Sequence, residues 1–117
     1  MPSEELVVEE TKGANDIAII RLAGPLTLAG VFKFQSICRA QNAAATIIDM
    51  TGVPYADSAG IGSLVLAHVS CQKAGRKLAL VGVSDRPKEV MRVTRVDQLF
   101  TIYPTVAEAE QKMTPVA

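Results

Sequence analysis

Residues 45–62 read A-T-I-I-D-M-T-G-V-P-Y-A-D-S-A-G-I-G and contain the clearest structural pattern of this chain. The stretch starts with the short apolar run Ala45 to Met50, which is typical of a strand buried on both faces of a sheet. Thr51 to Asp57 connects this strand to a predicted helix from about Ser58 to Lys73, with Gly75 as its left-handed cap. A buried strand followed directly by a helix indicates an α/β protein.

Apolar spacing predicts further strands and helices on both sides of this stretch. The strands are expected at residues 5–11, 17–22, 45–50, 77–82 and 99–103, the first two forming a β-hairpin. The helices are expected at residues 28–41, 58–73, 84–95 and 104–113. The order ββαβαβαβα predicts a single α/β domain over residues 1–117, with a core of about residues 5–113 and helices packed against a mixed β-sheet.

The composition suits a folded domain that has no nucleic-acid or membrane partner. The 117 residues are 49% hydrophobic, which is enough apolar material for a core. The net charge is zero and aromatic residues make up 4%, so neither attraction to nucleic acid nor base stacking is expected. The acidic amino terminus lacks a signal-peptide layout, and no apolar run approaches the roughly 20 residues that cross a bilayer. We therefore expect a cytoplasmic protein without membrane insertion.

The cysteines Cys38 and Cys71 fall in predicted helices far apart in the sequence. We expect reduced thiols that act as small hydrophobic side chains, not a disulfide or a metal site. One histidine and no clustered carboxylates also argue against a metal site. Gly60 and Gly62 lack the third glycine or the Lys-Ser/Thr pair of a phosphate-binding loop, so no cofactor is expected.

Ser58 could be a nucleophile only if a base lay within hydrogen-bond reach. The single histidine, His68, follows ten residues later on the same predicted helix. Ten helical residues span about 15 Å, which is too far for direct proton transfer. The G-x-S-x-G elbow of serine hydrolases is also absent. We therefore expect no catalytic residue and no enzymatic activity.

The local sequence around Ser58 also fits the start of a helix. Asp57 is a favourable N-cap, which leaves Ser58 at the first helical position with an exposed hydroxyl. Small residues that cost helix propensity fill the first two turns: Ala59, Gly60, Gly62 and Ser63. They indicate either a flat surface that another backbone approaches closely or tight packing of the helix on the sheet.

The sequence also resembles a known family. The segment I-I-D-M-T-G-V-P-Y-A-D-S-A-G-I-G-S-L-V-L-A-H is similar to the central signature of STAS domains, hydrophobic-hydrophobic-Asp followed by D-S-S-G-L-G. R-L-A-G-P-L looks like the family's second strand with its Gly-x-Leu turn, and A-G-R-K-L-A-L-V-G-V like the next strand with its preceding turn. D-Q-L-F-T-I-Y-P-T-V-A-E-A is similar to the usual carboxyl-terminal segment. The best-known stand-alone members are bacterial anti-sigma factor antagonists.

The resemblance implies a protein–protein switch. In such antagonists the serine after the motif aspartate, here Ser58, is phosphorylated by the anti-sigma factor, a serine kinase of the histidine-kinase-like ATPase type. The unphosphorylated antagonist binds that factor and frees a sigma factor, the phosphorylated form lets go, and a metal-dependent PP2C-type phosphatase restores it. The positions implied in partner binding are Asp57, Ala59, Gly60, Gly62, Ser63, Leu26 and Thr27.

Two positions differ from the family pattern. Ala59 replaces the usual second serine of the motif and leaves the acceptor Ser58 in place. Thr27 stands where the family commonly has an aspartate after Gly-x-Leu, and we expect it to cap the first helix.

Other polar residues are expected to have structural roles. Asp49, at the end of a buried strand, is expected to bond backbone amides of the loop that follows. His68 is expected to be an ordinary surface or boundary residue. Lys73, Arg76 and Lys77 are expected to form a solvated basic face that complements a helix dipole.

Two other functions remain open at this level. The chain could be a STAS scaffold in a larger, stressosome-like signalling assembly, or an adaptor subunit of a lipid or anion transporter. Self-association into a high-mass particle would favour the scaffold, whereas the adaptor requires a membrane partner.

Overall fold

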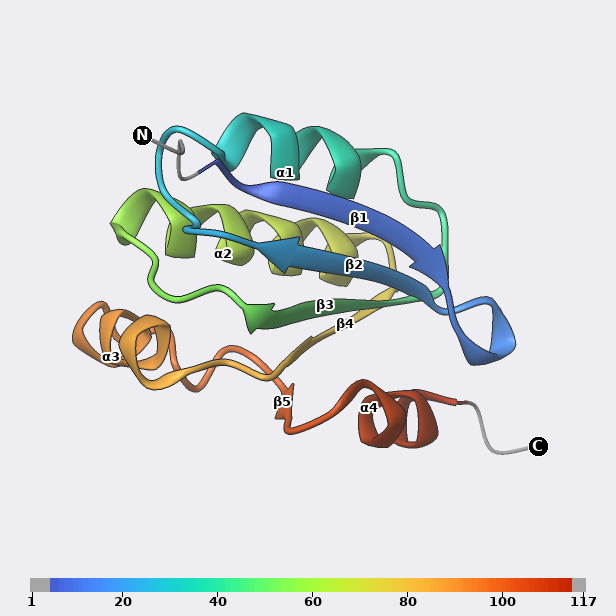
Figure 1. Cartoon of the computed structure of the whole chain (residues 1–117). Coiled ribbons are helices and arrows are strands. Elements are labelled where there is room, and N and C mark those ends of the chain that lie inside the picture. The colour runs from blue at the N-terminus through green and yellow to red at the C-terminus, as the bar shows by residue number, and fades with distance from the viewer. Residues whose placement is uncertain (1–4, 115–117) are drawn as a thin grey trace.

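The computed structural model describes residues 5–114, and its elements follow the predicted order. The strands are β1 (Val7–Lys12), β2 (Ala18–Ala23), β3 (Ala45–Gly52), β4 (Lys77–Val81) and β5 (Ile102–Tyr103). The helices are α1 (Val31–Arg39), α2 (Ser58–Lys73), α3 (Asp85–Val93) and α4 (Val106–Met113), with a short 3-10 helix at Ala14–Asp16. The α/β fold class predicted from the sequence is confirmed (Figure 1).

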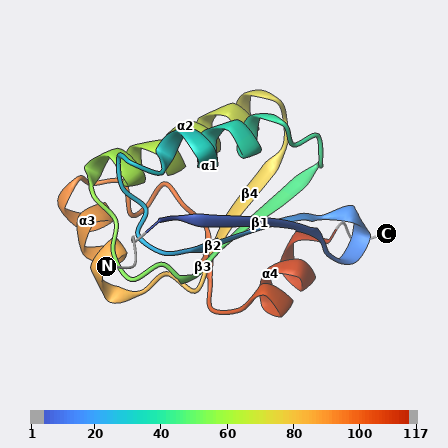
Figure 2. The ribbon, with the colours of Figure 1, turned by 45° about the horizontal axis from the view of Figure 1, so that its top comes forward.

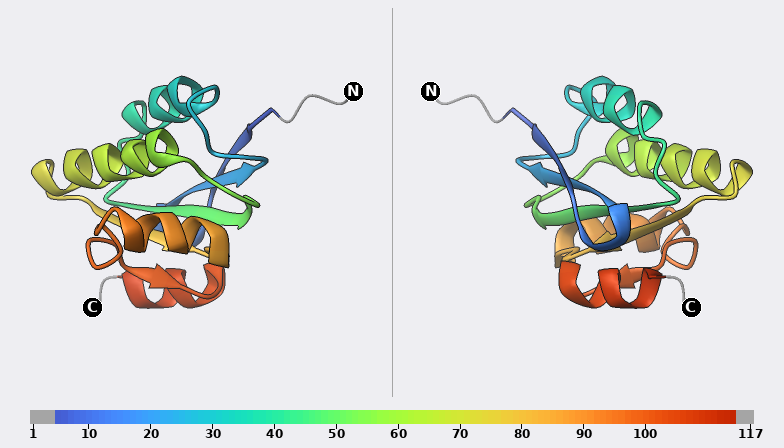
Figure 3. Two further views of the ribbon diagram at one scale, coloured as in Figure 1. Left: turned by 90° about the vertical axis from the view of Figure 1, so that its left-hand side faces the viewer. Right: turned by 90° about the vertical axis from the view of Figure 1, so that its right-hand side faces the viewer.

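The strands of the mixed sheet lie side by side in chain order, β1-β2-β3-β4-β5. β1 and β2 form the predicted antiparallel hairpin, with Val7 opposite Ala23 and Lys12 opposite Ala18, and all later neighbours are parallel. The helices α1 and α2 cover one face of the sheet, whereas α4 lies on the opposite face (Figures 2 and 3). Because β2 and β3 are parallel, α1 and α2 both begin at the carboxyl ends of these strands, so their amino termini share one end of the molecule (Figure 1).

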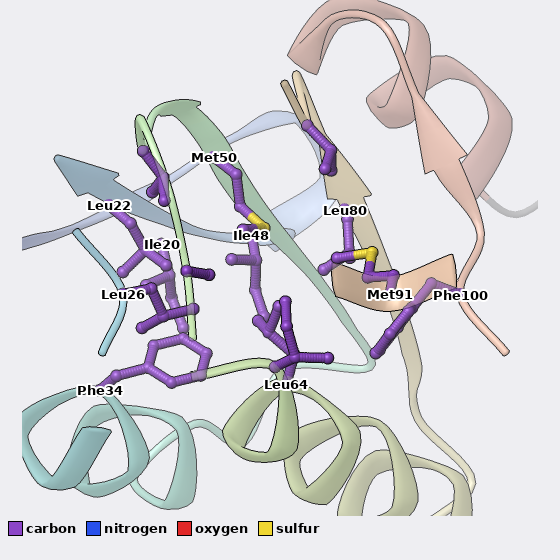
Figure 4. Packing of buried hydrophobic residues seen from close by; sticks show 14 of the residues in the cluster. Ile20, Leu22, Leu26, Phe34, Ile48, Met50, Leu64, Leu80, Met91 and Phe100 are labelled. Atoms are coloured by element: carbon purple, nitrogen blue, oxygen red, sulfur yellow. The ribbon is translucent and has the colours of Figure 1, made fainter. Parts of the chain in front are cut away.

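Alternation along the strands divides the core into two clusters, since successive strand residues point to opposite faces. Even-numbered residues of β2–β4 face α1, α2 and α3 in the larger cluster (Figure 4), among them Ile20, Leu22, Ile48, Met50, Leu80 and the helix residues Phe34, Leu64 and Met91. Odd-numbered residues face α4 in the smaller cluster: Ile17, Ile19, Ala45, Ile47, Ala79, Val81, Ala109 and Met113. The prediction that β3 is buried on both faces is therefore confirmed.

Two elements begin later in the chain than predicted. The first helix begins at Val31, not at residue 28, because the chain makes a turn in which the Gly30 amide donates to the Thr27 carbonyl at 2.9 Å. The side chain of Thr27 therefore does not cap α1; its N-cap is Gly30, which makes no side-chain cap bond. The last strand begins at Ile102, not at residue 99, because the Leu99 amide donates to the Val96 carbonyl in another turn.

The central helix agrees with its prediction at both ends. α2 runs from Ser58 to Lys73, and the expected left-handed residue after it is Gly75, with φ +70°. A left-handed backbone is inexpensive for glycine because it has no Cβ.

The two phenylalanines at the start of α1 allow a matched test of this core. Phe34 is fully buried, with 0% of its surface exposed, whereas Phe32 is 72% exposed. Phe34→Ala should lower the free energy of unfolding by about 3–5 kcal/mol, because it leaves a cavity in the larger cluster. Phe32→Ala should change it by no more than about 0.5 kcal/mol. Urea denaturation of both variants checks this, and equal losses would contradict the assigned orientation of α1.

Candidate functional site

The carboxylate of Asp57 joins the start of α2 to the chain before α1. One oxygen, Oδ1, accepts from the Gly60 amide at 2.7 Å, which is the N-cap geometry predicted from the sequence. The other oxygen, Oδ2, accepts from the Leu28 amide at 3.1 Å. This second bond was not foreseen, since Leu28 is distant in sequence. A single side chain therefore holds together the segments from which both helices start.

Backbone bonds pair two loops next to Asp57, residues 24–28 and residues 53–57, which we call the paired loops. The Leu26 amide donates to the Tyr55 carbonyl at 3.1 Å, and the Asp57 amide donates to the Leu26 carbonyl at 3.2 Å. Leu26 and Ala56 thereby form a parallel bridge, and Leu26 has 0% of its surface exposed. The paired loops extend the contact between β2 and β3 beyond the ends of the strands.

The helix α3 supports the paired loops from the other side. The hydroxyl of Ser84, the N-cap residue of α3, donates to the Val53 carbonyl at 3.1 Å. The guanidinium of Arg86 lies over the Tyr55 ring, 4.9 Å from its centroid. A cation held over an aromatic face in this way is stabilising.

Gly60 and Ser63 face the interior of the molecule. A Cβ on Gly60 would overlap the carbonyl oxygen of Leu26 and lie 2.7 Å from its carbonyl carbon. Ser63 is 1% exposed, and its hydroxyl donates to the Gly60 carbonyl at 2.6 Å. Three of the residues implied in partner binding, Leu26, Gly60 and Ser63, are therefore buried. They can affect a partner only indirectly, by fixing the conformation of the paired loops and α2.

The other implied residues are accessible. Ser58 is exposed at the first position of α2, and its hydroxyl makes no hydrogen bond to another described residue. A Cβ on Gly62 would meet nothing within 4 Å, so a partner backbone has room to approach there. Asp57, Ala59 and Thr27 are half-buried.

Three large apolar side chains are exposed on α2, on α1 and on the segment that precedes α1. Ser58, Gly62 and Leu66 recur every four residues and so lie along one face of α2. Leu66 is 58% exposed, and Leu28, whose amide is bound to Asp57, is 62% exposed. Phe32 extends this surface onto the first turn of α1. We call the surface formed by Ser58, Gly62, Leu66, Leu28 and Phe32 the apolar face. Its three large side chains were not identified from the sequence, although Leu28 and Phe32 lie off the core-facing positions of the predicted helix.

The remaining polar residues have structural contacts. Asp49 accepts from the Thr51 amide at 3.0 Å and the Thr51 hydroxyl at 2.6 Å, which confirms the predicted loop role, and pairs with Arg21 at 3.5 Å. His68 is half-buried and packs edge-on against Phe100 with ring centroids 5.9 Å apart. Since Ser58 and His68 lie on the same helix about 15 Å apart, they do not form a catalytic pair.

Two kinds of feature are missing from residues 5–114. This part of the chain holds no group of three or more His, Cys, Asp and Glu residues that could bind a metal ion. None of its helices has the length and apolarity needed to span a bilayer.

The STAS domain family model matches residues 8–109. The chain belongs to the STAS domain family. An anti-sigma factor antagonist from Mycobacterium paratuberculosis shares the fold with a TM-score of 0.84 at 16% sequence identity, over 96% of this chain and 97% of that one. The phosphorylated form of the Bacillus cell fate determinant SpoIIAA gives a TM-score of 0.73 at 15% identity, over 92% and 100% of the two chains.

Another solved structure with this fold is a sulfate transporter family protein from Wolinella succinogenes, with a TM-score of 0.73 at 22% identity, over 81% of this chain and 82% of that one. STAS domains thus occur in proteins of different roles, and the similarity at these identities is one of fold.

The thiols of Cys38 and Cys71 in this STAS domain are free, as predicted, but the two residues lie close to each other in the fold. Burial, followed by the nearby Cys71 and Glu10, raises the pKa of Cys38 to about 12. Burial also raises the pKa of Cys71, although the positive charge of Arg76 opposes this shift. The two residues occupy the last turns of neighbouring helices and line one cavity. Their separation of 33 positions in the sequence hid this proximity.

Gly60 and Gly62 provide a matched test of the site. Gly60→Ala should destabilise the domain by about 1–3 kcal/mol, because the new methyl group collides with the Leu26 backbone. Gly62→Ala has open space and should leave stability unchanged or raise it by up to about 1 kcal/mol, since alanine favours a helix. Thermal unfolding followed by circular dichroism distinguishes the two. A Gly60→Ala variant as stable as Gly62→Ala would contradict the close contact between α2 and the paired loops.

The thiol pKa values predict an order of alkylation. Only the thiolate reacts with iodoacetamide, and a rise in pKa from 9.0 to about 12 lowers the thiolate fraction of Cys38 about a thousandfold at pH 8. Mass spectrometry should therefore find Cys71 labelled first and Cys38 labelled only after addition of urea. Native Cys71→Ser should stay unlabelled, while Cys38→Ser should react like the wild type. Faster labelling of Cys38 in the folded protein would contradict the assigned burial.

Proposed function

We propose that this STAS domain is a phosphorylation-controlled binding module that antagonises an anti-sigma factor, with Ser58 as the phosphoacceptor. The fold is shared with anti-sigma factor antagonists and with a phosphorylated SpoIIAA, and it is typical of non-enzymatic binding modules. On this proposal the partner is an anti-sigma factor with serine kinase activity, and a PP2C-type phosphatase reverses the modification.

The observation that carries the proposal is the exposed hydroxyl of Ser58 at the end of the apolar face. Leu66, Leu28 and Phe32 are each more than half exposed, so they are available to pack against a partner. Gly62 leaves room for close approach of that partner. The position that would receive a phosphate therefore borders apolar surface that binding would dehydrate.

A phosphate on Ser58 affects the free domain and the complex differently. It adds about 1.5 to 2 negative charges, and the amino terminus of α2 stabilises an anion by about 0.3–1 kcal/mol. The neighbouring Asp57 carboxylate opposes this gain, but the exposed position lets water solvate the phosphate. In a close complex the unpaired charge would lose water at a cost of several kcal/mol. Since each 1.4 kcal/mol is about tenfold in affinity, the complex can dissociate without any change of fold.

Purified anti-sigma factors of the histidine-kinase-like ATPase type, taken from the host of this protein, provide the test. With ATP, one of them should place phosphate on Ser58, as read by tandem mass spectrometry, and Ser58→Ala should remain unmodified. In calorimetry without ATP, Ser58→Ala should bind that partner like the wild type. Ser58→Asp should bind at least about tenfold more weakly, with little change in thermal stability.

Ser70 provides the matched control for this experiment. It is exposed on α2, twelve positions after Ser58 and so about 18 Å away along the helix. Ser70 follows Leu66 by one helical turn and so lies just beyond the far end of the apolar face. Ser70→Asp should therefore weaken partner binding clearly less than Ser58→Asp does, because its charge lies at the edge of the proposed interface and not at the phosphoacceptor. If Ser58→Asp binds as tightly as Ser70→Asp, Ser58 is not the switch.

The similarity to a sulfate transporter family protein supports a second candidate, a scaffold or adaptor in a larger assembly. A stressosome-like scaffold would self-associate into a high-mass particle, which light scattering after size exclusion would detect. A monomer across micromolar concentrations that nevertheless binds an anti-sigma factor favours the antagonist.

A further inference from the structure

A cavity of about 290 Å³ lies between α1 and α2, away from the proposed phosphoacceptor. Its walls include Cys38 of α1 and Leu66, Ala67 and Cys71 of α2, and its floor includes Leu78 of β4. The two thiols are un-ionised at neutral pH, so these walls are apolar or weakly polar. Binding sites for small molecules are typically hollows of this size and apolarity with a few polar groups.

One end of the cavity is polar. Thr46 of β3 lines it with only 3% of its surface exposed, and its hydroxyl has no hydrogen-bond partner among the described residues. Since no buried side-chain nitrogen or oxygen among the described residues lacks a partner, this hydroxyl is accessible from the cavity and can donate to a ligand. Thr46 pairs with Leu78, two positions after Arg76, which brings the hydroxyl and the Arg76 guanidinium to the same end of the cavity.

The charges that line this end are positive. Arg76 donates through Nη1 to the Gln41 carbonyl, but a guanidinium has five N–H donors, so others remain for a ligand. Arg39 lines the cavity as well, and none of the described lining residues is acidic. The Glu10 carboxylate, which contributes to the raised pKa of Cys38, accepts from the Gln41 side-chain amide at 2.6 Å. The ends of α1 and α2 each contribute only about half a negative charge, which two full positive charges exceed.

We propose that this cavity binds a medium-chain fatty carboxylate, with the hydrocarbon chain between α1 and α2 and the head group at Arg76 and Thr46. An arginine fork matches the two oxygens of a carboxylate, and the Thr46 hydroxyl adds a donor. The cavity volume of about 290 Å³ lies at the lower end of the range for small-molecule sites, which favours a chain of medium length. The inference is independent of the phosphorylation of Ser58. Arg76, which was expected to belong to a solvated basic face, is half-buried and bonded to the Gln41 carbonyl, whereas Lys73 and Lys77 are exposed.

Calorimetric titration with sodium decanoate below its micelle concentration tests the proposal. Wild-type protein should bind one decanoate with a dissociation constant of about 10–100 μM, in the range expected for a ligand of this size. Arg76→Gln should weaken decanoate about tenfold or more. Lys77→Gln removes the adjacent exposed charge, which does not line this cavity, and should change binding less than about twofold.

Additional ligands and variants distinguish binding of the carboxylate head group from binding of the hydrocarbon chain. Decanol should bind wild type and Arg76→Gln equally, which also shows that the variant is folded. Thr46→Val should weaken decanoate but not decanol. Ala67→Phe fills the cavity and should abolish binding of both, with its fold verified by circular dichroism.

Three results would overturn the proposal. One is the absence of saturable decanoate binding to wild type up to about 1 mM, well above the expected range. Another is equal weakening by Arg76→Gln and Lys77→Gln, which would mean unspecific attraction by positive charge. The third is undiminished binding to a folded Ala67→Phe, which would place the ligand outside the cavity.

Discussion

The candidate site depends on the two hydrogen bonds that the Asp57 carboxylate accepts. By accepting from the Gly60 and Leu28 amides, this carboxylate satisfies a donor at the start of α2 and fixes the turn that leads into α1. Because the two oxygens of one short side chain each hold a backbone amide, the start of α2 and the segment before α1 have little freedom to move relative to each other. The paired loops then need the missing Cβ of Gly60, because the Leu26 carbonyl occupies that space. The small residues at the start of α2 thus serve two purposes: Gly60 permits internal packing, and Gly62 leaves the outer surface open.

The arrangement separates a rigid interior from a chemically modifiable exterior. Leu26, Gly60 and Ser63 are buried and bonded, whereas Ser58 is exposed at a helix terminus that tolerates an anion. A phosphate on Ser58 would therefore change the surface without disturbing the core, and its effect would be felt where the apolar face meets another protein. A switch of this kind requires no second conformation of the domain itself.

The cavity between α1 and α2 lies further along the same helix. Ser63 both lines the cavity and bonds the Gly60 carbonyl, so one side chain contacts the cavity and the first turn of α2. Leu66 belongs to both the apolar face and the cavity wall. A ligand between the helices would therefore touch residues that border the proposed partner surface, while its head group would lie at the opposite end of α2.

Sequence patterns were sufficient to predict the order of elements, the limits of α2, the cap at Asp57 and the exposed position of Ser58. These features depend on near neighbours: apolar periodicity, a capping residue and a glycine that adopts positive φ. The same patterns misjudged the start of α1 and the role of Thr27, because a turn and a helix differ there by backbone bonds that side-chain patterns do not reveal. Three features became visible only in the folded chain: Leu28 bonds Asp57, Leu26 lies beneath the surface, and Cys38, Thr46, Cys71 and Arg76 line one cavity. These contacts join residues that are far apart in the chain. Parallel pairing of the strands brings them together, because it determines which helix ends lie next to each other.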